Sequence, residues 1–109
     1  MRRIVYAGGT LYTGDAIAEA LLAYARALAR NGTADTVFVP AHTAEGDDGT
    51  IELLVGPASQ LVSEPVELAG PELADDDLVE RLRTLTAELE PRRPEAQSAA
   101  DVDLTDDIG

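Results

Sequence analysis

The segment most able to bind a ligand is a glycine-rich stretch between the first apolar run and the first helical pattern. Residues 6–15 read Tyr-Ala-Gly-Gly-Thr-Leu-Tyr-Thr-Gly-Asp. Backbone N–H groups at the start of a helix can hold a phosphate or a carboxylate, and glycine lets such a ligand approach closely. The candidate ligand-binding residues of such a turn between a strand and a helix are Gly8, Gly9, Thr10, Thr13 and Gly14, with the threonine hydroxyls as additional donors.

The same stretch departs from the known phosphate-binding motifs. It matches neither G-x-G-x-x-G nor G-x-x-x-x-G-K-[ST]. Gly9 and Gly14 have the outer spacing of the second motif, but Asp15 and Ala16 stand where lysine and serine or threonine belong. An aspartate at this point repels anions and interacts with the helix dipole itself. We therefore favour a tight turn with an intrinsic cap, and the ligand-binding turn is the alternative.

A second segment, residues 56–65, places polar side chains beside large aliphatic ones between two prolines. Polar groups above an apolar platform are typical of the lip of a ligand site or of a partner groove. We expect Ser59 and Gln60 to lie opposite the glycine-rich turn in such a site. The alternative is a short helix over residues 57–62 that places Leu61 and Val62 in the core.

His42 is the only histidine, and a hydrolytic triad can be written around it. Ser59 or Thr43 would be the nucleophile, and Asp47 or Asp48 would orient the imidazole. However, no spacing requires this arrangement, and the G-x-S-x-G elbow is absent. We therefore interpret His42 as a surface loop residue and predict no catalytic residues.

The acidic runs do not follow the pattern of a metal site. Glu45, Asp47 and Asp48 lack the twelve-residue spacing of a calcium loop, and Asp75 to Asp77 suit the start of a helix better. The chain contains no cysteine, which excludes disulfides and cysteine-ligated metals. We expect no metal and no cofactor.

Charge is distributed unevenly along the 109 residues, whose formal net charge is −13. Residues 1–40 hold four arginines against three acids, whereas residues 41–109 hold four arginines against eighteen acids. Nucleic acids and anionic membranes require a cationic surface, so we expect neither as a partner. The acidic half or tail is a candidate contact for a protein partner, and the alternative is that the acids only keep the protein soluble.

No stretch has the length of a signal peptide or a membrane span. The apolar run after Arg3 ends at Gly8, and the run over residues 16–29 is interrupted by Glu19 and Arg26. We expect a cytoplasmic protein. Eight arginines without a lysine, together with abundant alanine and aspartate, are typical of a GC-rich bacterial genome.

The elements expected around these segments follow from apolar periodicity. Strands are predicted over residues 3–7, 36–39 and 51–55, the last buried on both faces, with a hairpin loop over 42–50. A helix is predicted from about residue 13, capped by Thr13 or Asp15, to Asn31-Gly32. A second helix follows Gly70-Pro71 and carries a leucine stripe at positions 78, 82, 85 and 89, and residues 65–68 form a short edge strand or extended chain.

The order β-α-β-β-α predicts an α+β fold with two main helices and a small mixed sheet, its first two strands parallel across a right-handed crossover. Residues 1–90 form one compact domain, and residues 91–109 form a disordered acidic tail. The first helix is apolar nearly all round, so we expect a sheet on one side and a second subunit on another, which implies a homodimer.

These features favour a non-catalytic, homo-oligomeric protein-interaction domain from a bacterial cytoplasm. The alternative function is a small-ligand or phosphate-binding protein, or a minor enzyme, that uses the turn from Gly8 to Gly14.

Overall fold

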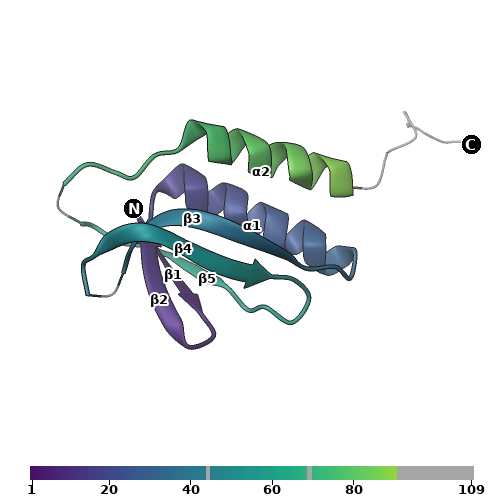
Figure 1. The fold of residues 1–109 in the computed structure, drawn as a ribbon, viewed down its shortest axis with the longest axis horizontal. Coiled ribbons are helices and arrows are strands. Elements are labelled where there is room, and N and C mark those ends of the chain that lie inside the picture. The colour runs from purple at the N-terminus through teal and green to yellow at the C-terminus, as the bar shows by residue number, and fades with distance from the viewer. Residues whose placement is uncertain (44, 69, 91–109) are drawn as a thin grey trace, which may run out of the picture.

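The computed structural model describes residues 1–43, 45–68 and 70–90, and these residues form a five-stranded sheet with two helices on one face (Figure 1). The α+β class and both main helices are confirmed. The elements, in chain order, are β1 (Arg2–Tyr6), β2 (Gly9–Thr13), α1 (Asp15–Arg30), β3 (Asp35–Thr43), β4 (Asp48–Val55), β5 (Val62–Pro65) and α2 (Asp76–Leu89).

The sheet order is β4-β3-β2-β1-β5, and every neighbouring pair is antiparallel. The sequence predicts a mixed sheet in which the strands now seen as β1 and β3 are parallel neighbours. They do run in the same direction, but β2 lies between them. Gly8, with φ at +84°, makes the tight turn that returns the chain into β2. A local hairpin therefore replaces the predicted crossover.

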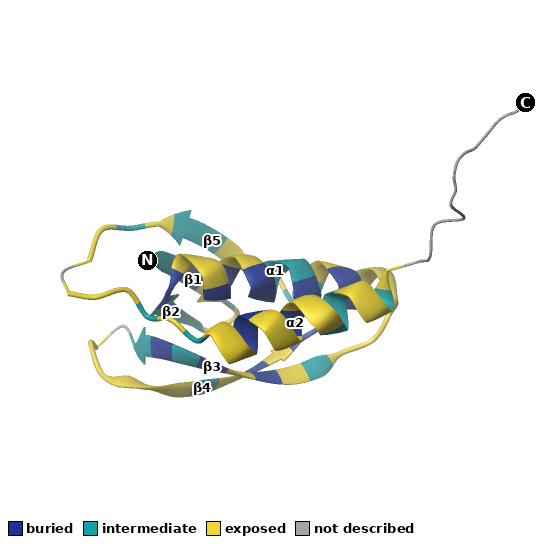
Figure 2. Ribbon diagram, turned by 90° about the horizontal axis from the view of Figure 1, so that it is seen from above, coloured by how far each residue is buried: buried dark blue, intermediate teal, exposed yellow. Residues whose placement is uncertain are grey.

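α1 and α2 run side by side on the same face of the sheet (Figure 2), and residues of both helices pack with the sheet in one core. Ile17, Leu21 and Leu28 are buried in the core, as the helical spacing predicts. Asn31 and Gly32 end the helix as expected, with Gly32 at φ +66°. The predicted cap at Thr13 or Asp15 is wrong, because Gly14 is the N-cap and supplies no side chain. α1 is therefore covered on two sides, by the sheet on one side and by α2 on the other.

α2 begins at Asp76, because the Asp75 carboxylate accepts a hydrogen bond from the Leu78 backbone N–H at 3.0 Å and caps the helix there. The leucine stripe is confirmed. Leu78 and Leu82 are buried, and Leu85 and Leu89 pack against the same core.

The chain between β4 and β5 is a turn rather than the predicted helix over 57–62. The Ser59 hydroxyl accepts from the Gly56 N–H at 3.1 Å and donates to the Leu54 carbonyl at 3.2 Å. These bonds close a tight turn, and the following residues pair with β1, where Val62 faces Val5. The predicted edge segment is thus a strand, displaced from 65–68 to Val62–Pro65.

β4 is an edge strand with one face on the core, so its predicted burial on both faces is wrong. Leu53 is 4% exposed, whereas its neighbour Leu54 is 70% exposed. The hairpin with β3 is confirmed, with a shorter loop because β3 continues through Pro40 to Thr43. The Pro40 carbonyl accepts a hydrogen bond from the Thr13 hydroxyl at 2.8 Å. The pairing of β3 with β2 covers only His42 and Thr43 of β3. The missing N–H of Pro40 therefore removes no backbone hydrogen bond between these two strands.

The predicted tail, residues 91–109, lies outside the described residues. Among the residues that are described, no helix is long and apolar enough to cross a membrane.

Candidate functional site

The face of the sheet opposite the helices, called the outer face below, carries large apolar side chains without a covering layer. Successive strand residues point to opposite faces. In β3 the odd-numbered Val37 and Val39 are buried, and the even-numbered Phe38 is 55% exposed. The exposed large hydrophobic residues of the sheet all belong to this outer set, namely Val5, Phe38, Leu54 and Val62.

Two shallow hollows lie beside Val5, Val62 and Leu54, and neither of them contains Phe38. One, of about 340 Å³, is lined by Val5, Val62 and Gln60 together with Tyr6, Ala7 and Ala58. The other, of about 230 Å³, also contains Gln60 and extends to Leu54. Contiguous apolar patches of this kind mark interaction sites on soluble proteins. The outer face is therefore the best candidate for a functional surface within the described residues.

A line of polar side chains crosses the outer face, one from each strand. The strand register places Asp48 beside His42, His42 beside Tyr12, Tyr12 beside Arg3, and Arg3 beside Glu64. Directly opposite residues on one face of a sheet have Cβ atoms about 4.5–5.5 Å apart. We call these five residues the polar row.

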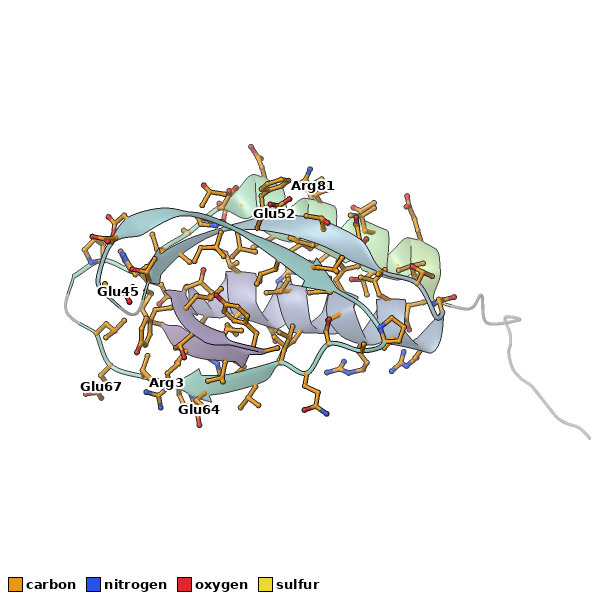
Figure 3. The ribbon with its side chains drawn as sticks, turned by 60° about the horizontal axis from the view of Figure 1, so that its bottom comes forward. Arg3, Glu45, Glu52, Glu64, Glu67 and Arg81 are labelled. Atoms are coloured by element: carbon orange, nitrogen blue, oxygen red, sulfur yellow. The ribbon has the colours of Figure 1, made fainter. Side chains whose placement is uncertain are left out.

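The charges of the polar row are paired at both ends. Arg3 donates from Nε to Glu64 Oε1 at 2.8 Å, and a second Arg3 nitrogen lies 2.8 Å from the same oxygen. The hydrogen bond to Glu64, with a smaller contribution from Tyr12, raises the pKa of Arg3 above its ordinary value. At the opposite end His42 Nδ1 contacts Asp48 Oδ1. Figure 3 shows Arg3 and Glu64 together at one side of the sheet.

The five glycines and threonines predicted to form a ligand-binding turn are spread along a hairpin instead. Gly8 is at its tip, and Gly9 opens β2 so close to the Tyr6 ring that a Cβ would lie 2.8 Å from the Tyr6 hydroxyl. Thr10 lies on the outer face, whereas Thr13 is fully buried. The predicted strand-to-helix turn is therefore wrong, because residues 9–13 are themselves a strand.

Gly14 and the start of α1 leave no room for an external anion. A Cβ on Gly14 would lie 1.8 Å from the Leu73 carbonyl oxygen, so the backbones of the two segments are in direct contact. The Asp15 backbone N–H donates to Glu72 Oε2 at 2.6 Å. A carboxylate of the chain itself thus occupies the position at which a helix N-terminus would bind a phosphate.

Ser59 and Gln60 have separate roles. Ser59 forms its bonds within the turn after β4, and Gln60 lines both hollows of the outer face beside Tyr6 and Ala7. The structure therefore brings Gln60 near the tip of the β1–β2 hairpin. It does not bring Ser59 and the predicted threonines together around one ligand.

The residues of the hypothetical triad are likewise only partly brought together. His42 and Asp48 are in contact, but the Thr43 hydroxyl accepts from the Asp47 N–H at 3.1 Å and Ser59 belongs to its own turn. Within residues 1–43, 45–68 and 70–90, no group of three His, Asp or Glu side chains is arranged to hold a metal ion.

Sequence reasoning did not identify the outer face as a functional surface. The alternation of Val37, Val39 and Ala41 with Phe38, Pro40 and His42 was the available signal, since it is typical of a strand with one covered face. No protein-family model matches the chain, and neither a curated protein nor a solved structure matches it.

Proposed function

We propose that the protein is a non-catalytic protein-interaction domain that forms a homodimer through the outer face of its sheet. The observation that carries the proposal is the exposure of Val5, Phe38, Leu54 and Val62 on the one face of the sheet that the helices leave uncovered. Covering such a patch removes apolar surface from water, which is the dominant favourable contribution to most protein association.

The distribution of charge supports a second copy as the partner. Each chain has a formal net charge of −13, so two copies repel each other unless they meet where the charge is low. On the outer face Arg3 is paired with Glu64, and His42 contacts Asp48. Glu52, which is paired with Phe38 in the strand register, forms no ion pair with a described residue. With His42 counted as neutral, Arg3 against Glu64, Asp48 and Glu52 gives these residues a formal charge of 1 − 3 = −2, a small part of the −13 of the chain.

The shape of the sheet limits the size of this contact. Only two residue pairs join β2 to β3, and Figure 3 shows Glu52 at the opposite side of the sheet from Arg3 and Glu64. The outer face is therefore curved, and a second copy covers only part of it. We therefore expect a dimer that dissociates on dilution. Face-to-face packing of two sheets about 10 Å apart is a common arrangement.

The test is the molar mass of the full chain in solution, measured by light scattering over a range of protein concentrations. We expect the mass to rise toward that of a dimer with concentration. Leu54→Asp should abolish the rise, because it places a charge on the most exposed apolar side chain of the outer face. Leu68→Asp is the matched control, since Leu68 is also exposed, at 43%, but lies after β5.

A monomer at every concentration would contradict the proposal, and so would equal dissociation by Leu54→Asp and Leu68→Asp. The proposal retains the bacterial cytoplasm as the compartment expected from composition.

A further inference from the structure

The groove between α1 and α2 is separate from the outer face and lies on the opposite side of the molecule. Figure 2 looks onto the two helices side by side. The groove encloses about 380 Å³ along the C-terminal halves of both helices. Its lining from α1 is Ala20, Ala23, Arg26 and Arg30, and its lining from α2 and the following residue is Arg83, Thr86, Ala87 and Glu90.

The groove combines small side chains with a cationic rim. Ala87 is exposed and Ala23 is half-buried, and their small side chains leave space for larger aliphatic side chains from elsewhere. Three arginines border the groove against one acid, Glu90, which is paired with Arg30 at 3.1 Å. In the described part of the chain, no carboxylate lies within ion-pair distance of Arg26 or Arg83. The lining of the groove itself is therefore cationic, while Glu19 shares a neighbouring hollow with Arg26, and Asp76 and Glu80 share one with Arg83.

The sequence that follows α2 is complementary to this groove. The chain leaves α2 at Leu89, and Glu90 is already part of the lining. Residues 101–108 read Asp-Val-Asp-Leu-Thr-Asp-Asp-Ile, which places four acids among three large aliphatic residues. We propose that residues 101–108 bind in the groove of the same molecule, with their carboxylates on Arg26 and Arg83 and their aliphatic side chains over the alanines.

The length of the connecting segment allows this contact. An extended chain spans at most about 3.3–3.6 Å per residue, so the residues between Glu90 and Asp101 can reach beyond 30 Å. On α1, Ala20 and Arg30 are about 15 Å apart along the helix axis at 1.5 Å per residue. A short flexible tether gives an effective concentration on the order of millimolar, so a weak contact suffices to fill the groove.

The absence of cysteine makes a direct test possible. Thr105→Cys, labelled with a nitroxide, gives the full chain a single spin label within the proposed segment. We expect the backbone amide signals of Ala23 and Ala87 to broaden severalfold relative to the reduced label, and that of Thr50 on the other side of the sheet to stay sharp. Mixing isotope-labelled protein without a spin label with spin-labelled protein without isotope separates contact within one molecule from contact between two.

Matched variants test the charge contribution. Arg83→Gln should weaken the broadening severalfold, because it removes a cation from the rim. Arg81→Gln makes the same change two residues earlier, on the other side of α2, and should leave the broadening unchanged. Raising the salt from about 0.1 M to about 1 M shortens the screening length from ~10 Å to ~3 Å and should also weaken it.

Sharp Ala23 and Ala87 signals in the spin-labelled chain would overturn the proposal. So would broadening that appears equally in the mixed sample, because the segment would then bind a second copy. Equal effects of Arg83→Gln and Arg81→Gln would show that the groove arginines do not hold the segment. The outcome is independent of dimerisation through the outer face, since Leu54→Asp leaves the groove intact.

Discussion

The hydroxyl of Tyr24, on the inner side of α1, donates to Asp35 Oδ2 at the first residue of β3, with 2.6 Å between the oxygens. Tyr24 is only 4% exposed. The other oxygen of the same carboxylate accepts from the Thr36 backbone N–H at 2.8 Å. The Asp35 side chain therefore connects the helix to the strand that follows it and fixes where β3 begins.

Tyr24→Phe should lower the free energy of unfolding by about 1.5–3 kcal/mol, the usual contribution of a hydrogen bond to a charged group. The ring still fills the core, but Asp35 loses a donor. Tyr6→Phe is the matched control, because the Tyr6 hydroxyl makes no hydrogen bond to a described residue. Urea denaturation of both variants measures the difference, and equal effects would show that the Tyr24 bond adds no stability.

The same pair predicts how stability depends on alkaline pH. Burial, with the bond to Asp35, raises the pKa of Tyr24 from 10.0 to about 12. The folded state therefore favours the neutral phenol. The stability that the neutral Tyr24 phenol contributes is fully present below pH 10, the pKa in the unfolded state, and is lost as the pH rises through about 12.

From this shift we expect the difference in free energy of unfolding between wild type and Tyr24→Phe to fall by about 2–3 kcal/mol between about pH 9 and about pH 12. The other tyrosines are common to both proteins, so their titration cancels in the comparison. Urea denaturation at both ends of this range measures the convergence, and a constant or widening difference would contradict the assignment.

The parts of the fold that sequence could predict are those set by local pattern. α1 follows from apolar residues at helical spacing and from the Asn31-Gly32 stop, and both signals lie in the helix or directly after it. β2 was missed because its inward side chains are Leu11 and Thr13, and a buried threonine resembles a loop residue. The bond from Thr13 to the Pro40 carbonyl makes its burial favourable, and that partner is 27 positions away.

The outer face could not be predicted for a related reason. Arg3 and Glu64 are 61 positions apart and become neighbours only because β5 returns along β1. The register of five strands decides which side chains share a line, and a shift of one residue would send them to the opposite face. The sequence predicts excess apolar surface on α1, but α2 covers that side of the helix. Nothing in the leucine stripe of α2 indicates that it packs against α1, and the exposed apolar side chains of the sheet were not predicted.

Gly14→Ala should destabilise the protein by about 2–3 kcal/mol or more, since overpacking forces the backbone to move. The reason is space alone. Gly14 has φ −68°, which alanine adopts readily, but the new Cβ would lie 1.8 Å from the Leu73 carbonyl oxygen. Thermal unfolding measures the loss.

Gly49→Ala is the control for this substitution. Gly49 lies in β4 with nothing within 4 Å of the new Cβ, so its replacement should be neutral or slightly stabilising. If Gly14→Ala were as stable as Gly49→Ala, the contact between Gly14 and Leu73 would not be tight in solution. Because we expect Gly14 variants to unfold more easily, they cannot test ligand binding at this segment. Thr10→Val, on the outer face, is the cleaner variant for that purpose.

Leu53 and Leu54 offer a comparison of the two faces of β4 with one substitution. Leu53→Ala should cost about 2–5 kcal/mol of unfolding free energy, because it leaves a cavity in the core. Leu54→Ala should change the stability of the monomer by less than about 0.5 kcal/mol, since its side chain is already in water. Urea denaturation of dilute protein measures both values.

Protein concentration then separates folding from association in the same pair of variants. If two copies meet through the outer face, wild type becomes more resistant to urea as concentration rises, because the dimer forms only from folded chains. Leu54→Ala should weaken the dependence of urea resistance on protein concentration. Leu53→Ala should lower stability at every concentration and leave that dependence unchanged. A wild-type midpoint that does not move with concentration would show that the exposed Leu54 side chain is not used for self-association.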